Sequence, residues 1–258
     1  MNAKTLEITP VPAFSDNYIW LLTTGGPECA VVDPGDHRPV LEALGRLGLS
    51  LQYILLTHHH ADHIGGVKGL LEAYPAEVFG PVDSRINQPI QAVSEGARVE
   101  LPKLGLSFGV LEVPGHTRSH IAFHGEGVLF SGDTLFSIGC GRLFEGTAEQ
   151  MQQSLDKLAA LPATTRIYCG HEYTVSNCAF ALEVEPDNKA LRVRAQQAER
   201  ARQGGECTIP STLADELAAN PFLRTRQEAV VTAARQREPG AAPGAGTMAV
   251  IRAWKDEW

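Results

Sequence analysis

Residues 53–63 read YILLTHHHADH, so that a short apolar run ends directly in a cluster of histidines. The apolar run predicts a buried strand, and Thr57 to His63 then form the turn that leaves it. Because side chains alternate along an extended chain, we expect His58 and His60 to point to the same side. His59 then points away from both, and we predict a structural role for it.

The pattern H-x-H-x-D-H places four potential metal ligands within six residues. They are His58, His60, Asp62 and His63. Asp62 and His63 are adjacent, so the turning chain can direct them toward a second ion. Imidazole and carboxylate groups suit zinc, iron or manganese. A chance polar loop or a histidine tag is the alternative, but a tag lies at a terminus and does not follow an apolar strand.

Three further candidate ligands each follow a short apolar run and a glycine, which lets the backbone turn closely beside a site. They are His116 in VPGHT, Asp133 in FSGDT and His171 in YCGHE. Together with the first motif they supply five histidines and two aspartates, enough for two ions that share one carboxylate. The remaining histidines lack this setting, and we expect surface or packing roles for His37, His120 and His124.

Length and composition limit the class of protein. The chain has 258 residues, 43% of them hydrophobic, which suits one large domain or one domain plus a smaller one. No apolar run approaches the roughly 18 residues of a membrane span, and the start lacks the pattern of a secretory signal. The net charge of −8 argues against a general nucleic-acid binder. Five scattered cysteines without a CxxC pair argue against a disulfide framework and favour a reducing cytoplasm.

Patterning divides the chain into a mixed body and a helical tail. The expected strands are 18–23, 29–32, 51–56, 106–113, 121–123, 128–131 and 166–169. The expected helices of the body are 39–47, 64–74 and 148–160, the last with Thr147 as its N-cap. Strand signals become rare after about residue 172, where 189–202, 225–237 and 248–258 predict helices. Residues 238–247, EPGAAPGAGT, predict a mobile loop.

These motifs carry a family resemblance. The H-x-H-x-D-H motif with the later His, Asp and His resembles the metallo-β-lactamase superfamily. Residues 12–18, 139–147, 171–174, 220–224 and 252–256 are similar to the hydroxyacylglutathione hydrolase, or glyoxalase II, branch, so the resemblance covers essentially the whole chain. It implies an α/β fold, an αββα sandwich with a small C-terminal helical domain. It further implies a catalytic domain at residues 1–171 and a substrate-binding domain at residues 172–258.

The resemblance also implies a site. His58, His60 and His116 bind the first ion, Asp62, His63 and His171 bind the second, and Asp133 bridges them. Two divalent ions per chain are implied, with zinc expected and iron or manganese as alternatives, and Asp62 and Asp133 hold the metal-bound hydroxide. The glutathione moiety is held by Arg142, Tyr173, Arg252 and Lys255. Phe144 stands where some members have a tyrosine, so a hydroxyl contact is lost there.

The implied activity is hydrolysis of S-D-lactoylglutathione to D-lactate and glutathione, the second step of methylglyoxal detoxification. Two metal ions can supply both a nucleophilic hydroxide and a stabilised oxyanion, so no serine nucleophile is required, and the chain has no G-x-S-x-G motif. An acidic protein repels the carboxylates of glutathione unless cations are placed locally. Arg142, Arg252 and Lys255 are suitable partners.

Three alternatives remain open at this point. A glutathione persulfide dioxygenase with one iron handles glutathione too, but it generally lacks the full helical tail and the complete second ligand set. A class B1 β-lactamase is disfavoured because Asp133 stands where that enzyme places a cysteine. A catalytically silent metal-binding module is disfavoured because all seven ligands are intact. We expect a cytoplasmic monomer that acts on a small-molecule thioester and binds neither nucleic acid nor membrane.

Overall fold

A computed structural model describes residues 5–258. The chain forms two compact units. The first contains the chain up to Glu112 together with Ser119–Gly132, and the second contains Val113–Arg118 together with Asp133–Trp258. The segment 113–118 therefore leaves the first unit and returns to it, which places His116 in the second unit.

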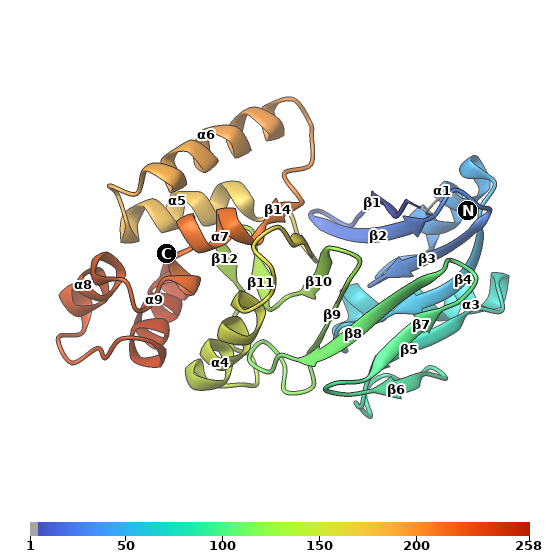
Figure 1. The fold of residues 1–258 in the computed structure, drawn as a ribbon, viewed down its shortest axis with the longest axis horizontal. Coiled ribbons are helices and arrows are strands. Elements are labelled where there is room, and N and C mark those ends of the chain that lie inside the picture. The colour runs from blue at the N-terminus through green and yellow to red at the C-terminus, as the bar shows by residue number, and fades with distance from the viewer. Residues whose placement is uncertain (1–4) are drawn as a thin grey trace. The chain divides into compact units, whose positions relative to one another are not determined.

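The first unit is built on a six-stranded sheet whose strands lie side by side in chain order (Figure 1). They are β1 (Glu7–Ala13), β2 (Asn17–Thr23), β3 (Glu28–Val32), β4 (Ser50–Leu55), β5 (Glu77–Pro81) and β6 (Gln91–Val93). β1, β2 and β3 pair antiparallel, whereas β3, β4, β5 and β6 pair parallel. The carboxyl ends of β3 and β4 are therefore neighbours, the place where open α/β sheets bind ligands.

Helices α1 (His37–Leu47), α2 (Ala61–Ile64) and α3 (Val67–Ala73) belong to the same unit. Val40 and Leu44 of α1 and Leu70 of α3 share one buried apolar cluster with residues of the sheet. Asp36 caps α1 by accepting a hydrogen bond from the Arg38 amide.

The helix predicted over residues 64–74 is confirmed as α3, but it begins later than predicted, at Val67, because the chain breaks between α2 and α3. The reason is a close approach of two backbones. The Gly66 amide donates to the Pro34 carbonyl at 2.8 Å, and a Cβ at Gly66 would lie only 2.5 Å from that same oxygen. The glycine pair therefore packs against the turn after β3 and ends the helix.

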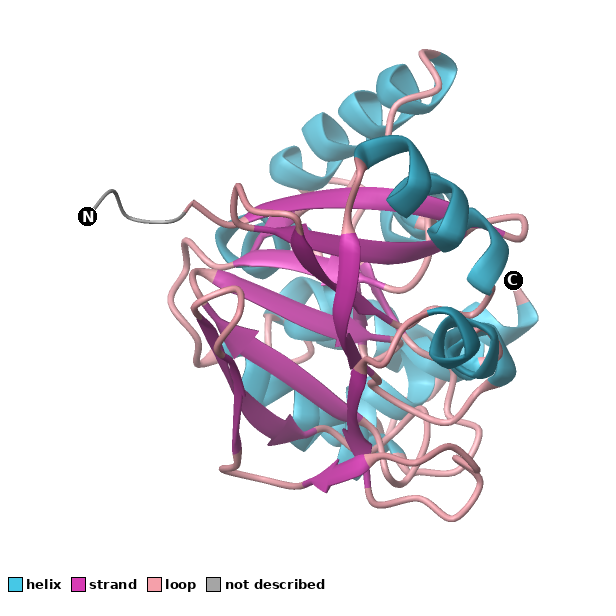
Figure 2. Cartoon of the chain, turned by 90° about the vertical axis from the view of Figure 1, so that its right-hand side faces the viewer, coloured by secondary structure: helices cyan, strands magenta, loops and turns pink. Residues whose placement is uncertain are grey.

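The remaining strands of the first unit form an antiparallel meander in the order β10-β9-β8-β7 (Figure 1). They are β7 (Arg98–Leu101), β8 (Leu106–Glu112), β9 (Ile121–Gly125) and β10 (Val128–Gly132). Figure 2 draws all strands in magenta and all helices in cyan. Burial alternates along β7 and β8, as expected for strands with one face in a core. The predicted strands 106–113, 121–123 and 128–131 are confirmed as β8, β9 and β10. The sequence patterns did not predict β1, β5, β6 or β7.

The second unit is mainly helical. Its helices are α4 (Ala148–Ala159), α5 (Thr174–Val184), α6 (Lys189–Gln203), α7 (Leu213–Ala219), η1 (Pro221–Leu223), α8 (Glu228–Arg237) and α9 (Ala245–Glu257). Its short strands are β11 (Leu135–Phe136), β12 (Gly139–Cys140), β13 (Arg166–Cys169) and β14 (Ser211–Thr212). Thr147 caps α4 in a capping box with Gln150, which confirms the predicted cap.

The helical C-terminal region predicted from the sequence is confirmed, with corrections. The helices α5 and α7 were not predicted. The predicted loop 238–247 is wrong at its end, because α9 already begins at Ala245. Among residues 5–258, no helix has the length and apolar character needed to cross a bilayer.

Candidate metal centre and substrate-binding residues

The histidine cluster lies at the carboxyl end of β4, within the first unit. His58 and His63 are buried, while His60 and Asp62 are partly exposed. The ring centroid of His58 lies 4.7 Å from that of His60 and 4.1 Å from that of His63. The backbone of His60 is still extended, and α2 begins at the next residue. The alternation predicted for this stretch therefore brings the side chains of the motif together.

Asp33, at the carboxyl end of β3, organises this cluster. Its carboxylate accepts hydrogen bonds from the Thr57 amide at 2.8 Å and from the Thr57 hydroxyl at 2.7 Å. The same carboxylate lies 3.0 Å from Nδ1 of His63. Because the Thr57 hydroxyl donates to Asp33, its oxygen is an acceptor for Nδ1 of His58, which lies 3.0 Å away. One aspartate thus orients two histidines, directly and through Thr57.

Asp33 was not among the predicted site residues. The sequence Asp33-Pro34-Gly35 indicated only a turn, although Asp33 follows an apolar strand as the predicted ligands do. Its φ of 51° is a left-handed conformation that Asp tolerates better than most residues. The nearest ligand-type atoms of Asp33, His58 and His63 lie within 4.8 Å of one another. The hydrogen bonds that Asp33 accepts nevertheless assign it to orientation of the histidines.

Asp62 is held by Asn17 of β2. The Asn17 side-chain amide donates to Asp62 Oδ2 at 2.9 Å and lies 3.3 Å from the Asp62 carbonyl oxygen. Asp62 Oδ2 also lies 3.5 Å from Nε2 of His63. Asn17 lies in the segment 12–18 that carried part of the resemblance, but no role was predicted for it. A neutral amide fixes the Asp62 carboxylate without removing its charge.

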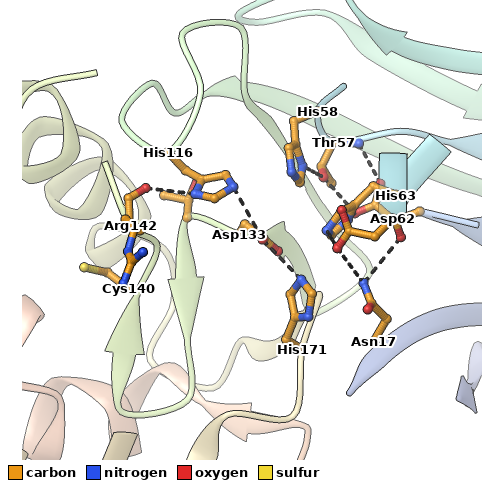
Figure 3. Close-up of polar contacts among 12 residues, drawn as sticks. Asn17, Thr57, His58, Asp62, His63, His116, Asp133, Cys140, Arg142 and His171 are labelled. Carbon is orange, nitrogen blue, oxygen red and sulfur yellow. Dashed lines mark hydrogen bonds and ion pairs between the residues drawn. The ribbon is translucent and has the colours of Figure 1, made fainter. Parts of the chain in front are cut away.

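The second unit brings together the three remaining predicted ligands (Figure 3). Asp133 Oδ2 lies 3.5 Å from Nε2 of His116 and 3.2 Å from Nε2 of His171. All three side chains are at least nine-tenths buried. Nδ1 of His116 donates to the Arg142 carbonyl at 2.9 Å. A carboxylate placed between two imidazoles is the arrangement that a shared metal ligand requires.

The donor chemistry of both clusters fits divalent metal ions. Nδ1 of His63 and of His116 each face an oxygen that can only accept, which fixes the proton on Nδ1. The Thr57 hydroxyl, which donates to Asp33, likewise accepts from Nδ1 of His58. The lone pair of each ring is then on Nε2, the usual state of a metal-bound histidine. His/Asp clusters of this kind support binding of divalent metal ions.

Gly141, the residue after β12, lies close to the Asp133 backbone and to the His116 side chain. A Cβ at Gly141 would lie 2.0 Å from the Asp133 carbonyl oxygen and 3.1 Å from the His116 side chain. Only glycine fits there. The turn before β12 is anchored by Glu216, which accepts from the Ile138 amide at 2.8 Å and from the Asn220 side chain at 2.9 Å. Burial raises the pKa of this Glu216 carboxyl.

Two of the four predicted substrate-binding residues, Arg142 and Arg252, contact Asp256 in the second unit. Arg142 Nε donates to Asp256 Oδ1 at 2.9 Å, and Arg252 Nη2 donates to the same oxygen at 3.1 Å. Arg252 is buried, and its Nη1 donates to the Cys140 carbonyl at 2.8 Å. The cations predicted to bind a carboxylated substrate are therefore already ordered by an acidic partner. The sequence analysis assigned no role to Asp256, although it stands next to Lys255 and one helical turn after Arg252.

Lys255 is a half-buried cation of α9 in the second unit. Its ammonium group donates to Asn177 Oδ1 and lies 5.8 Å and 6.0 Å from the ring centres of Phe180 and Phe222. Burial, together with the like charge of the neighbouring Arg252, lowers the pKa of Lys255 to about 8. A positive charge held at this position is therefore sensitive to mildly alkaline pH.

Tyr173 lies apart from this group of contacts and packs on a predicted metal ligand. Its ring stacks on that of His171 at a centroid distance of 4.8 Å and an interplanar angle of 4°. Phe144, the residue that replaces a tyrosine, is 60% exposed, and its ring lies edge-on to His116 at 5.2 Å. An aromatic ring therefore flanks each of two histidines of the second unit.

The other histidines behave as predicted. His120 is buried and stacks on His58, with ring centroids 4.6 Å apart and an angle of 18° between the planes. His37 has a 41% exposed side chain. Burial lowers the pKa of His124. His59 lies 3.4 Å from the Asp83 carboxylate, in keeping with a structural role.

Comparison with known proteins identifies the family. The model of the metallo-beta-lactamase superfamily matches residues 14–171, and that of the hydroxyacylglutathione hydrolase C-terminus matches residues 172–258. The hydroxyacylglutathione hydrolase of Alkalilimnicola ehrlichii is 55% identical over 258 residues, which cover 97% of this chain and 99% of the relative. The chain belongs to the hydroxyacylglutathione hydrolase family. The predicted enzyme class, a thioester hydrolase of the metallo-β-lactamase superfamily, is confirmed, and the dioxygenase alternative is not favoured.

Solved structures agree with this family and its fold. ETHE1 from Myxococcus xanthus superposes with a TM-score of 0.64 at 25% identity and covers 97% of each chain. TTHA1623, solved in a di-iron-bound form, has a TM-score of 0.60 at 29% identity, covering 83% of this chain and 100% of that protein. The predicted metallo-β-lactamase fold with a helical C-terminal region is confirmed.

Proposed function

We propose that this hydroxyacylglutathione hydrolase family member cleaves S-D-lactoylglutathione to D-lactate and glutathione, with two divalent ions at its centre. The observation that carries the proposal is the position of Asp133 Oδ2 between Nε2 of His116 and Nε2 of His171. A single carboxylate oxygen between two imidazoles suits a ligand that two ions share. The reaction is the second step of methylglyoxal detoxification.

The proposed ligand sets follow the family. His58, His60 and His116 hold one ion, Asp62, His63 and His171 hold the other, and Asp133 bridges them. We expect zinc, and iron and manganese suit the same donors. A relative solved in a di-iron-bound form supports two ions of that kind. When bound, such ions lower the pKa of a water molecule to near neutrality and polarise a thioester carbonyl.

The chain's own residues orient the reacting groups. In this proposal the carboxylates of Asp62 and Asp133 accept hydrogen bonds from the attacking water or hydroxide. Asn17 holds the Asp62 side chain at 2.9 Å. Residues that fix a nucleophile before the reaction contribute by orientation, which removes much of the entropic barrier to attack.

In this proposal Arg142, Tyr173, Arg252 and Lys255 hold the glutathione moiety, and the three cations bind its carboxylates. Two of these cations already share Asp256 Oδ1 as an acceptor. Arginine can grip a carboxylate through two parallel hydrogen bonds, which gives the contact direction as well as charge. We also propose that residues 172–258, which contain Tyr173, Arg252 and Lys255, act as the substrate-binding domain.

The experiment is hydrolysis of S-D-lactoylglutathione by purified protein whose bound metals have been quantified. Turnover with about two ions per chain, abolished in Asp133→Ala, is expected. Asp156→Ala is a matched control, because Asp156, on α4, forms an ion pair with Arg226 at the surface. Absence of turnover at full metal loading would contradict the proposal and favour a silent metal-binding module. Oxygen uptake with glutathione persulfide would contradict it in favour of a dioxygenase.

Two further expectations complete the proposal. We expect a monomer, which light scattering coupled to size-exclusion chromatography measures directly. We also expect a cytoplasmic protein, which fractionation of the source cells tests. The small-molecule thioester is the proposed partner, and nucleic acid and membrane surfaces are not.

A further inference from the structure

Asp83, two residues after β5, lies at the centre of a buried polar cluster in the first unit. Its side chain is only 4% exposed. Arg85 donates to it from its backbone amide at 2.9 Å, from Nε at 2.8 Å and from Nη2 at 2.7 Å. The Ser119 hydroxyl donates to Oδ2 of the same carboxylate. The hydrogen bonds from Arg85 and Ser119 hold the pKa of Asp83 well below its usual range.

His59 approaches this carboxylate from the histidine cluster. Its Nδ1 lies 3.4 Å from Asp83 Oδ2, and its side chain is 11% exposed. His59 stands between two proposed ligands of one ion, and its ring lies edge-on to that of His60 at 4.8 Å. Because His59 is bonded to both neighbours in the chain and its ring contacts that of His60, holding the His59 side chain restricts the directions of His58 and His60.

The Asp83 carboxylate also binds Ser119, in the segment whose His120 ring packs on His58. Ser119 precedes His120, whose ring stacks on that of His58 at 4.6 Å. The amide of Ile121 donates to the Thr57 carbonyl at 2.9 Å. Asp83 therefore holds two segments at once, one that contains His58 and one that covers it.

We propose that Asp83 is a positioning residue of the metal-binding loop, which acts through His59 and Ser119 to set the directions of His58 and His60. The proposal rests on the metal centre of the proposed function. Such outer partners of metal ligands change metal affinity when they are removed, because the ligands lose their preset orientation.

The chain contains a matched control. Asp36 and Arg38 repeat the Asp-x-Arg arrangement of Asp83 and Arg85. The Arg38 amide donates to Asp36 Oδ1 at 3.0 Å, and Arg38 Nη2 donates to Oδ2 at 2.6 Å. The histidine beside Asp36 is His37, at 3.7 Å, which is not a proposed ligand. Substituting Asn at either position removes the same charge from the same kind of arginine pair.

The test compares the wild type with Asp83→Asn, His59→Ala and Asp36→Asn. Zinc affinity is measured by competition with a chelator, and the geometry of the site by the visible spectrum of the cobalt-substituted protein. Thermal unfolding of the metal-free proteins reports the structural effect alone. We expect zinc affinity to fall about 10- to 100-fold in Asp83→Asn and His59→Ala, with an altered cobalt spectrum, and to stay within about twofold in Asp36→Asn.

Kinetics supply a further readout. In Asp83→Asn, excess zinc is expected to restore kcat for the thioester while KM stays near the wild-type value. The inference is overturned if Asp83→Asn lowers only the unfolding temperature, or if Asp36→Asn weakens zinc binding equally. Wild-type protein that binds zinc but does not hydrolyse the thioester refutes the proposed function alone, because the zinc and cobalt measurements need no turnover.

Discussion

Raising the pH from 7 to 9 is expected to increase KM for a glutathione thioester about tenfold. The cause is Lys255, whose pKa burial lowers to about 8. A lysine is charged below its pKa, so about nine-tenths of the molecules carry this cation at pH 7 and about one-tenth at pH 9. If a substrate carboxylate binds only the charged form, the apparent affinity falls in proportion.

The surroundings of Lys255 explain why the effect falls in this pH range. The ammonium group lies near the rings of Phe180 and Phe222, and it donates a hydrogen bond to the neutral Asn177 amide oxygen rather than to a carboxylate. Arg252 adds a like charge nearby. A bound carboxylate offsets both effects and raises the pKa of Lys255 in the complex. The change is therefore expected in kcat/KM, which reports the free enzyme, and appears as a rise in KM with kcat unchanged.

The assay is steady-state hydrolysis of S-D-lactoylglutathione between pH 6.5 and 9.5, with metal content measured at each pH. Lys255→Gln is the control. Its KM is expected to be higher than that of the wild type at pH 7, and to lack the increase between pH 7 and 9 that deprotonation of Lys255 causes. The amino group of the substrate titrates in the same range, but it does so equally with both proteins. A flat KM in the wild type, or an equal rise in the variant, would refute the reasoning.

Three other substitutions test the site. Arg252→Met should raise KM about 10- to 100-fold with metals retained. The reason is that a hydrogen bond to a charged group contributes about 1.5–3 kcal/mol. Loss of metal in this variant would instead contradict the substrate-binding role proposed for α9. Asp33→Asn should weaken zinc binding about 10- to 100-fold in chelator competition, and an unchanged affinity would show that the network around His63 does not orient it. Gly141→Ala should lower kcat and metal content together, because its Cβ would meet the Asp133 carbonyl oxygen at 2.0 Å, whereas Gly240→Ala meets no atom within 4 Å and serves as the control.

The candidate ligands could be named from the sequence because each one follows a simple rule. A buried strand ends, a glycine or a turn follows, and a His or Asp stands at the end of the strand, as Asp133 does after β10 and His171 after β13. Their grouping within each unit could be anticipated, since strand ends at one edge of a sheet are close in space. The residues that orient the ligands could not, because Asp33 meets His63 across 30 positions of the chain.

The missed elements have local explanations. β1 contains Pro10 and Pro12, which weaken a strand signal, and its burial alternates only partly. Helix α5 reads TVSNCAFALEV, with apolar residues on most sides and little polar face, so the periodicity of a surface helix is absent. The break between α2 and α3 depends on the backbone of Pro34, 32 residues before Gly66. Each of these features is decided by tertiary packing rather than by local preference.

The segment Gly139–Arg142 connects metal-ligand geometry with substrate binding inside the second unit. On one side, the Arg142 carbonyl accepts from Nδ1 of His116, and Gly141 lies against the Asp133 backbone. On the other, the Cys140 carbonyl accepts from Arg252, and the Arg142 side chain reaches Asp256. The same four residues therefore set a ligand's ring orientation and the position of two cations. A backbone shift in Gly139–Arg142 must therefore change the His116 ring orientation and the positions of the two cations together. A variant that changes KM alone must act through the side chains of α9 and not through this segment.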